Sequence, residues 1–489
     1  MSDRRTAVVE GVEVALDHAI GGERVGSSTT FEDRSPLDWS LLLGEVARGD
    51  VRTADLAMAA AAAAADGWAA MGVAGRAAIL RRLADLIDAR TEDLAIVECL
   101  DMAMLHESLR LRVIGRAARN FRAYADLAAS YEPRRWSSNG TENEVRRMPA
   151  GPTVVITPWN APFMLSTWKA APALAAGNPV VLKPAEWSPL SCSILADLAE
   201  EAGVPPGVLN VVQGLGREVG AALVADPRAR RISFTGSPET GRSIGEAAAR
   251  NLVPFTAELG GKGPLLVFAD ADLDAAATAA ARMYDDAGQV CLAGTRLLVE
   301  ATARAAFLER FRRATDAHVL GDSRDPQTTI SPLIHPDHLA RVEGFVDRAR
   351  SAGDTVLFGG RRWKDDGLWY EPTLIEPHAN DAEIVQREVF GPVLTIQTFR
   401  DEPEAVALAN STPYGLSAIV FTSDAARADR LGDAVRAGTV WTNCYLVRDL
   451  SAPFGGTGIS GIGREGGEYA LDFYSELKTV QVKEGTTHG

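Results

Sequence analysis

The sequence predicts an α/β protein in which strands alternate with helices, so that a parallel sheet carries helices on both faces. Short apolar strands alternate with helical segments from residue 150 to about residue 275, and the alternation repeats through about residue 445. The chain has 489 residues, which is enough for two or three domains with a substantial core. We therefore expect one α/β unit followed by a second.

The individual elements can be placed along the chain. Apolar residues recur at three- and four-residue spacing over 53–130, which predicts helices. Asn139-Gly140 follows and favours a β-hairpin over 134–148, because both residues accept a positive φ. Strands are expected in GPTVVITPW, NPVVLKP, VLNVVQG, RISFTGS, PFTAELGGKGPLLVF and the tail SELKTVQVKEG. Helices are expected in STWKAAPALAAG, SPLSCSILADLAEEAG, REVGAALVAD and PETGRSIGEAAAR.

The composition, with 46% hydrophobic and 24% charged residues, is that of a soluble globular protein. A net charge of -15 argues against nucleic acid or an anionic membrane as the main partner. No signal peptide is visible, and the apolar run at 56–65 is too short to span a bilayer. The scattered cysteines favour a reducing cytoplasm and have no metal-like spacing; they are Cys99, Cys192, Cys291 and Cys444.

Two glycine loops follow predicted strands and open predicted helices. GLGREVG (214–220) resembles a dinucleotide fingerprint but has one residue too many before its last glycine. The backbone N–H groups of FTGSPETG (234–241) could face a phosphate. The alternative is that both loops are ordinary turns between a strand and a helix.

The segment LKPAEWSP (182–189) places Lys183 and Glu186 just after a strand. A carboxylate there can accept hydrogen bonds from a ribose diol, and a lysine can add a charge-assisted bond. Glu186 would repel a 2′-phosphate, so NAD is favoured over NADP. The alternative is a solvated charged loop.

Three further residues could take part in catalysis. Asn160 in TPWNAPF could stabilise an oxyanion, or it could only cap the following helix. Glu258 in AELGGKG could be a general base whose pKa is raised by burial. A lone cysteine such as Cys291 in DDAGQVCLAG is more often buried and inert, and no histidine lies close to it in sequence.

One reaction uses all these parts. The Cys291 thiolate adds to an aldehyde, and Asn160 and the Cys291 backbone N–H stabilise the resulting oxyanion. Hydride passes to a nicotinamide, and Glu258 activates the water that hydrolyses the remaining thioester. A hydrolase without redox chemistry, a CoA-acylating dehydrogenase and a non-catalytic binding protein on the same fold are the alternatives.

Six motifs carry a resemblance to a known family: TPWNAPF, LKPAEWSP, FTGSPETG, ELGGK, GQVC and EVFGPV. In order and spacing they resemble the NAD(P)-dependent aldehyde dehydrogenase superfamily over residues 20–485. The resemblance implies an aldehyde dehydrogenase-like fold with a Rossmann-type cofactor domain (1–130 and 149–259) and an α/β catalytic domain (260–455). It also implies a small β arm (131–148 and 470–489) that joins subunits into a homodimer or homotetramer.

The resemblance also assigns roles to residues of this chain. It implies that Cys291 is the nucleophile, Glu258 the general base and Asn160 part of the oxyanion hole. The implied cofactor-binding residues are Ile156, Thr157, Trp159, Lys183, Glu186, Gly216, Gly236, Ser237, Gly241, Leu259, Glu388 and Phe390. The chain departs from the family pattern at Gly263, at Thr457-Gly458 and in segment 98–108.

The C-terminal stretch from NCYLVRDL to LKTVQV resembles the branch that oxidises 2-hydroxymuconate and 2-aminomuconate semialdehydes. The resemblance implies that two arginines, Arg116 and Arg448, bind the substrate carboxylate. A neutral aromatic or aliphatic aldehyde is the alternative substrate.

Overall fold

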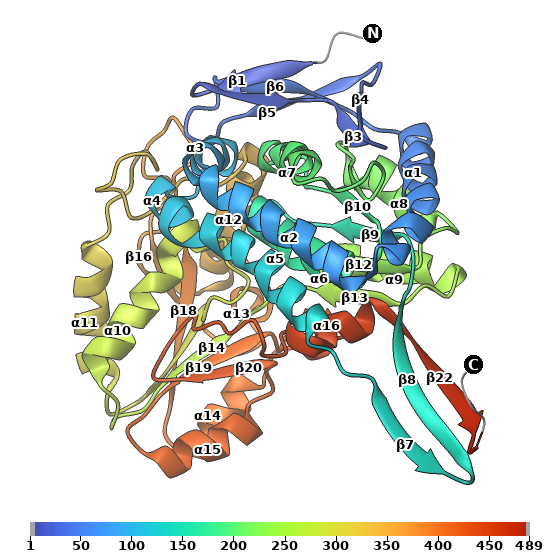
Figure 1. Cartoon of the computed structure of the whole chain (residues 1–489). Helices are drawn as coiled ribbons and strands as arrows, with labels where there is room; N and C mark the ends of the chain where they lie inside the picture. The colour runs from blue at the N-terminus through green and yellow to red at the C-terminus, as the bar shows by residue number, and fades with distance from the viewer. Residues whose placement is uncertain (1–4, 486–489) are drawn as a thin grey trace.

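The computed structural model describes residues 5–485, and two large sheets with their helices form its body (Figure 1). The first sheet has the strand order β21-β13-β12-β9-β10-β11-β3-β4. Its strands are β3 (His18–Ile20), β4 (Glu23–Val25), β9 (Thr153–Ile156), β10 (Val180–Lys183), β11 (Leu209–Val211), β12 (Arg231–Thr235), β13 (Phe255–Glu258) and β21 (Gly461–Ile462). The central strands β9 to β13 pair in parallel, as the alternation predicts. The edge strands β3, β4 and β21 lie outside the segments in which strands and helices alternate, and they pair antiparallel.

The second sheet has the strand order β16-β17-β18-β15-β14-β19-β20. Its strands are β14 (Pro264–Val267), β15 (Arg296–Glu300), β16 (Thr355–Phe358), β17 (Thr373–Glu376), β18 (Val393–Phe399), β19 (Ser417–Phe421) and β20 (Thr439–Thr442). All neighbouring pairs are parallel except β16 with β17. This is the second α/β unit that the repeated alternation predicts.

Helices cover both sheets. Those around the first sheet are α1 (Val51–Ala70), α2 (Gly72–Ala89), α3 (Thr91–Met102), α4 (His106–Ser108), η1 (Leu109–Val113), α5 (Ile114–Ala129), α6 (Pro162–Ala175), α7 (Leu190–Glu201), η2 (Gly216–Gly220), α8 (Ala221–Ala225) and α9 (Pro238–Arg250). The remainder are α10 (Leu273–Ala281), η3 (Arg282–Gly288), α11 (Arg304–Asp316), α12 (Pro336–Ala352), α13 (Glu383–Gln386), α14 (Glu402–Ala409), α15 (Ala425–Ala434), η4 (Gly458–Ser460) and α16 (Gly467–Phe473). The helices expected over 53–130 and between the strands of the first sheet are confirmed.

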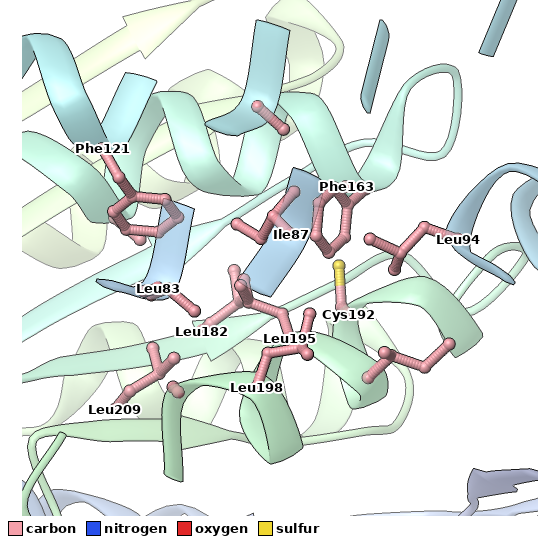
Figure 2. Close-up of a cluster of buried hydrophobic side chains, with 14 of the residues drawn as sticks. Leu83, Ile87, Leu94, Phe121, Phe163, Leu182, Cys192, Leu195, Leu198 and Leu209 are labelled. Atoms are coloured by element: carbon pink, nitrogen blue, oxygen red, sulfur yellow. The ribbon is translucent and has the colours of Figure 1, made fainter. Parts of the chain in front are cut away.

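Alternate residues of the central strands of the first sheet pack into two different hydrophobic cores, because successive side chains of a strand point to opposite faces. Val155 and Leu182 pack with α2, α3, α5, α6 and α7, whereas Val154 and Val181 pack with α1, α8 and α9. Figure 2 shows the first of these cores, in which Leu83 and Ile87 of α2, Phe163 of α6 and Cys192 of α7 meet Leu182 of β10. The central strands are therefore covered on both sides, as their continuous apolar runs predict.

Helix α1 begins at a capping box, in which the Asp50 carboxylate accepts from the Thr53 backbone N–H at 2.9 Å. Helix α2 starts at Gly72, whose φ of 74° lies in the left-handed region. No single helix within residues 5–485 is long and apolar enough to cross a membrane. Helices α1 and α2 together have the length and composition of a membrane span, but the pair is bent by 113°.

A three-stranded arm extends from the body (Figure 1). It consists of β7 (Arg134–Ser138), β8 (Thr141–Pro149) and β22 (Ser475–Lys483). Asn139 and Gly140 have φ values of 53° and 72°, so the predicted Asn-Gly hairpin turn is confirmed. The predicted tail strand is also confirmed, and it pairs antiparallel with β8.

Several strands that were not predicted from the sequence lie in the first fifty residues. Besides β3 and β4, these are β1 (Thr6–Val9), β2 (Val12–Ala15), β5 (Thr30–Arg34) and β6 (Leu42–Ala47). They are short and form small antiparallel pairs. Strands of three to six residues contain too few repeats of the apolar–polar alternation to give a clear periodic signal.

Candidate active site

A cavity of about 730 Å³ lies where the carboxyl ends of several strands of the first sheet meet residues of the second α/β unit. Asn160 follows β9, Gly236 follows β12 and Glu258 ends β13, while Cys291 comes from the loop before β15. Ligands of open α/β sheets bind at this edge of the sheet.

The cavity brings together many of the residues that the sequence singles out. Its wall contains the three candidate catalytic residues Cys291, Glu258 and Asn160, the candidate cofactor residues Trp159, Gly236, Ser237, Leu259, Glu388 and Phe390, and both Arg116 and Arg448. The other candidate cofactor residues lie outside this wall, on β9, β10, η2, α9 and the loops after β9 and β10; they are Ile156, Thr157, Lys183, Glu186, Gly216 and Gly241.

Cys291 is half-buried and lies after a stretch of left-handed backbone at Asp286, Ala287 and Gly288. Its enclosure raises the pKa of the thiol to about 12, and the nearby Glu388 carboxylate acts in the same direction. The Arg448 guanidinium opposes this shift. In this structure the group is therefore a thiol at neutral pH, and it has to lose its proton when it reacts.

Asn160 does not cap the following helix. Helix α6 is capped at Ala161, without a side-chain bond. The Asn160 amide instead donates to the backbone carbonyl of Gln289 at 2.8 Å, two residues before Cys291. Its second amide hydrogen has no acceptor among the residues that the structure describes, so it is free to meet a group in the cavity.

Glu258 is only 5% exposed. Neither of its carboxylate oxygens has a hydrogen-bond partner within residues 5–485. Burial raises the pKa of this carboxyl well above its ordinary value, and the charge of Glu465 raises it further. A buried, unpartnered carboxyl that faces a cavity can accept a proton from water held there.

Glu465 also lines the cavity, and no sequence motif singles it out. Its carboxylate forms a buried ion pair with Lys169 of α6. It also accepts hydrogen bonds from the Trp168 indole at 2.7 Å and from the Ser233 hydroxyl at 3.0 Å. The available signal was Lys169 itself, because the chain has only six lysines and this one lies inside an apolar helix.

At the other end of the candidate cofactor site, the Lys183 ammonium lies 3.1 Å from the Glu186 carboxylate. Lys183 is almost fully buried, so the alternative of a solvated charged loop is wrong for this lysine. Burial would raise the pKa of Glu186, but the neighbouring Lys183 ammonium and the backbone hydrogen bonds of Glu186 and Gly216 together outweigh it and hold the pKa below its usual value. Glu186 therefore presents an ionised acceptor.

The N-terminus of α9 faces the cavity. Ser237 is the N-cap residue, and its hydroxyl accepts from the Thr240 N–H at 3.2 Å. Gly241 in the same helix packs against Leu259, since a Cβ there would approach the Leu259 Cδ2 atom to 2.8 Å. A helix N-terminus, an ionised carboxylate for a diol and a lysine together fit the phosphate and ribose groups of a dinucleotide.

Arg116 of α5 and Arg448 of the loop after β20 meet over one aromatic ring. Their guanidinium carbons lie 5.5 and 5.8 Å from the centre of the Trp168 ring, and Arg448 also lies 3.8 Å from the centre of the Phe454 ring. Neither arginine has an acidic partner within 4.0 Å in the described part of the chain. Burial lowers the pKa of Arg116 to about 10, and the charge of Arg448 contributes.

Arg448 does not form an ion pair with its sequence neighbour Asp449. The Asp449 carboxylate accepts from the backbone N–H and the hydroxyl of Ser451, at 2.9 and 2.6 Å. Arg448 therefore faces the cavity together with Arg116.

One departure from the family pattern has a steric cause. A Cβ at Gly263 would lie 2.9 Å from the Ser417 carbonyl oxygen and 3.1 Å from the Ala293 carbonyl oxygen. A residue with a side chain would not fit these surroundings without a backbone shift.

Comparisons with known proteins agree with the geometry. The chain matches the model of the aldehyde dehydrogenase family over residues 24–480. It is 42% identical to a 2-hydroxymuconic semialdehyde dehydrogenase of Pseudomonas sp. (strain CF600), over 96% of this chain and 99% of the relative. It is 41% identical to a betaine aldehyde dehydrogenase of Cereibacter sphaeroides (strain ATCC 17029), over 88% of this chain and 89% of the relative.

Among solved structures, the chain is similar to the indole-3-acetaldehyde dehydrogenase of P. syringae in complex with NAD+ and IAA. The TM-score is 0.95 at 36% sequence identity, and the match covers 97% of this chain and 98% of that chain. The family match and the long, closely similar relatives establish what the six motifs indicate: the chain belongs to the aldehyde dehydrogenase family and is an oxidoreductase that acts on aldehydes with NAD(P).

Proposed function

We propose that the protein oxidises a carboxylate-bearing semialdehyde of the 2-hydroxymuconate type to the corresponding acid, with NAD as cofactor. The observation that carries this proposal is the pair Arg116 and Arg448, two cavity-lining guanidinium groups without an acidic partner in the described chain. A substrate carboxylate would neutralise their mutual repulsion and could accept two parallel hydrogen bonds from each fork.

The same pair disfavours a cationic substrate. Betaine aldehyde carries a quaternary ammonium group, which two guanidinium groups would repel. The 41% identity to a betaine aldehyde dehydrogenase therefore supports aldehyde oxidation by this chain, but it does not support betaine aldehyde as the substrate. A neutral aldehyde remains the competing substrate, and variants of Arg116 and Arg448 distinguish the two kinds of substrate.

In the proposed mechanism Cys291 is the nucleophile. Its thiol first gives its proton to water in the cavity. The sulfur then forms a bond to the aldehyde carbon as the carbonyl π bond breaks, so that the electron pair goes to the oxygen. The Asn160 amide and the Cys291 backbone N–H donate hydrogen bonds to that oxygen. The bond from Asn160 to the Gln289 carbonyl holds the amide near the sulfur before substrate arrives.

NAD, when bound, supplies the acceptor for the hydride that leaves the thiohemiacetal carbon. We propose that Lys183, Glu186, Ser237, Glu388 and Phe390 hold it. Loss of the hydride leaves a thioester on Cys291. Glu258 takes a proton from water, the water oxygen bonds to the acyl carbon, and the carbon–sulfur bond breaks to release the acid.

The arginine pair gives a substrate-dependent prediction. Arg448→Leu is expected to lower kcat/KM for a carboxylate-bearing semialdehyde by roughly 30-fold or more, the loss typical when one member of a desolvated charge pair is removed. Arg116→Leu should act in the same direction. Efficiency toward a neutral aldehyde of similar size should change little, and steady-state assays of NADH formation with both substrates measure the difference.

The matched control is Arg119→Leu, which removes an exposed arginine of the same helix α5 that does not line the cavity. It should leave both substrates unaffected. Equal losses on both substrates in the Arg448 and Arg116 variants would indicate structural damage, and no loss on either would remove the muconate-type assignment.

The choice of NAD over NADP gives a second prediction. The ionised Glu186 should repel a 2′-phosphate, so kcat/KM should be higher with NAD. Glu186→Gln keeps the size of the side chain but removes its charge, and it should narrow the ratio between the two cofactors. Comparable kcat/KM values for NAD and NADP in the unmodified enzyme would show that Glu186 does not discriminate.

We also propose that the enzyme is cytoplasmic and forms a homodimer or a homotetramer. We assign the cofactor domain to 1–130 and 149–259, the catalytic domain to 260–455 and the oligomerisation arm to 131–148 and 470–489; residues 1–4 and 486–489 lie outside the described chain. Exposed apolar side chains on the arm, Trp136, Met148 and Leu477, support its role as a contact between subunits.

A further inference from the structure

The segment Glu388–Phe390 forms part of the cavity wall and has an unusual backbone. Phe390 has a φ of 61°, in the left-handed region that side chains with a Cβ rarely adopt. Gly391 follows, and a Cβ there would lie 2.7 Å from the Val342 Cγ2 atom of α12. The segment therefore lies directly against α12, and its conformation needs support from outside.

Helix α12 supplies this support through its side chains. The His338 imidazole Nε2 lies 2.7 Å from the Phe390 carbonyl oxygen. Arg341 donates to the Glu388 carbonyl oxygen at 2.8 Å and also to the Val389 carbonyl oxygen. Three consecutive carbonyl groups are thus held by two side chains that lie three residues apart, on one face of the helix.

His338 makes this bond as a neutral donor. It is 5% exposed, and burial lowers the pKa of the imidazole to about 4. A carbonyl oxygen only accepts hydrogen bonds, so the tautomer must carry its proton on Nε2. The bond should therefore be unchanged across neutral pH.

The same ring connects the segment to the first sheet. Its centre lies 5.2 Å from Trp159 in an edge-on arrangement, and Trp159 in turn lies 5.3 Å from the ring of Phe390. Trp159 belongs to the turn after β9 and directly precedes Asn160. On the other side of the segment, the Glu388 carboxylate accepts from the Gly261 backbone N–H at 2.8 Å.

We infer that His338 is a positioning residue that fixes the strained Glu388–Phe390 segment in the form that binds the cofactor. The inference rests on the proposed function, in which Glu388 and Phe390 contact that cofactor. His338 acts through the Phe390 carbonyl and the Trp159 ring.

The test compares His338→Leu with His338→Gln. The leucine variant keeps bulk but removes the donor, whereas a glutamine amide can reach the position of Nε2. The control is Leu339→Ala, which removes a buried side chain of the same helix without touching the hydrogen bond. Isothermal titration calorimetry gives the Kd for NAD, steady-state kinetics gives KM and kcat, and thermal unfolding without cofactor gives the Tm.

We expect His338→Leu to raise the Kd and KM for NAD about tenfold, the loss of one well-formed hydrogen bond, with a much smaller change in the KM for aldehyde. His338→Gln should recover the Kd to within about twofold. Leu339→Ala should lower the Tm but leave the Kd for NAD near that of the unmodified enzyme. The ratio of Kd values between His338→Leu and the unmodified enzyme should be constant from about pH 6 to about pH 9.

An unchanged Kd in His338→Leu would overturn the inference, as would an equal rise in Leu339→Ala or no recovery in His338→Gln. A ratio that falls as the pH rises would indicate direct binding of the cofactor by a protonated imidazole and would also overturn it. Failure of the unmodified enzyme to bind NAD would instead contradict the proposed function, so the two failures are distinguishable.

Discussion

Cys291→Ala is expected to abolish aldehyde oxidation while NAD binding persists. The variant removes the only atom proposed to bond to the aldehyde carbon, whereas the proposed cofactor contacts at Lys183, Glu186 and Ser237 lie on other elements. Loss of a covalent nucleophile typically lowers kcat by about 10⁴-fold or more. Absorbance of NADH measures turnover, and calorimetric titration with NAD measures the retained binding.

The control is Cys444→Ala, which removes another half-buried cysteine, on the loop after β20. This variant should keep most of the activity, and so should alanine variants of the buried Cys99 and Cys192 if they fold. Full activity in Cys291→Ala would refute the covalent mechanism, and loss of NAD binding would mean that the cysteine supports the cofactor site.

Glu258→Gln is expected to keep a rapid burst of NADH but to lose steady turnover. Acylation and hydride loss precede the step that most needs a base, so the variant should accumulate as an acyl-enzyme. Removing a general base typically costs about 10²–10⁴-fold. Stopped-flow absorbance measures the burst, and mass spectrometry of the quenched protein detects the added acyl group.

The raised pKa of Glu258 adds a pH dependence to this experiment. Only the ionised carboxylate can take a proton from water, so hydrolysis in the unmodified enzyme should speed up as the pH rises through that pKa. Glu246→Gln, on the exposed side of α9, is the control and should behave like the unmodified enzyme. A variant with neither burst nor acyl-enzyme would mean that Glu258 acts before the thioester forms.

The sequence by itself determined the features that depend on neighbouring residues. The central strands of both units follow from short apolar runs separated by helices, and the hairpin turn follows from the φ preferences of Asn139 and Gly140. Asn160 follows the strand β9 and Glu258 ends the strand β13, at the edge where an open α/β sheet binds its ligands. The catalytic roles expected of these two residues and of Cys291 follow from the resemblance that the six motifs carry. Local periodicity and turn chemistry suffice for the strands and the turn.

Only the tertiary structure decided which distant residues meet. Glu465 reaches Lys169 across 296 residues, and Arg116 meets Arg448 over the ring of Trp168. Neither contact has a local signature, because dihedral preferences and periodicity do not specify how remote elements pack. The antiparallel edge strands β3 and β21 could not be predicted from the sequence for the same reason. A strand of two or three residues is stabilised by the sheet edge that it joins, and that edge forms only when the remote strands of the sheet have paired.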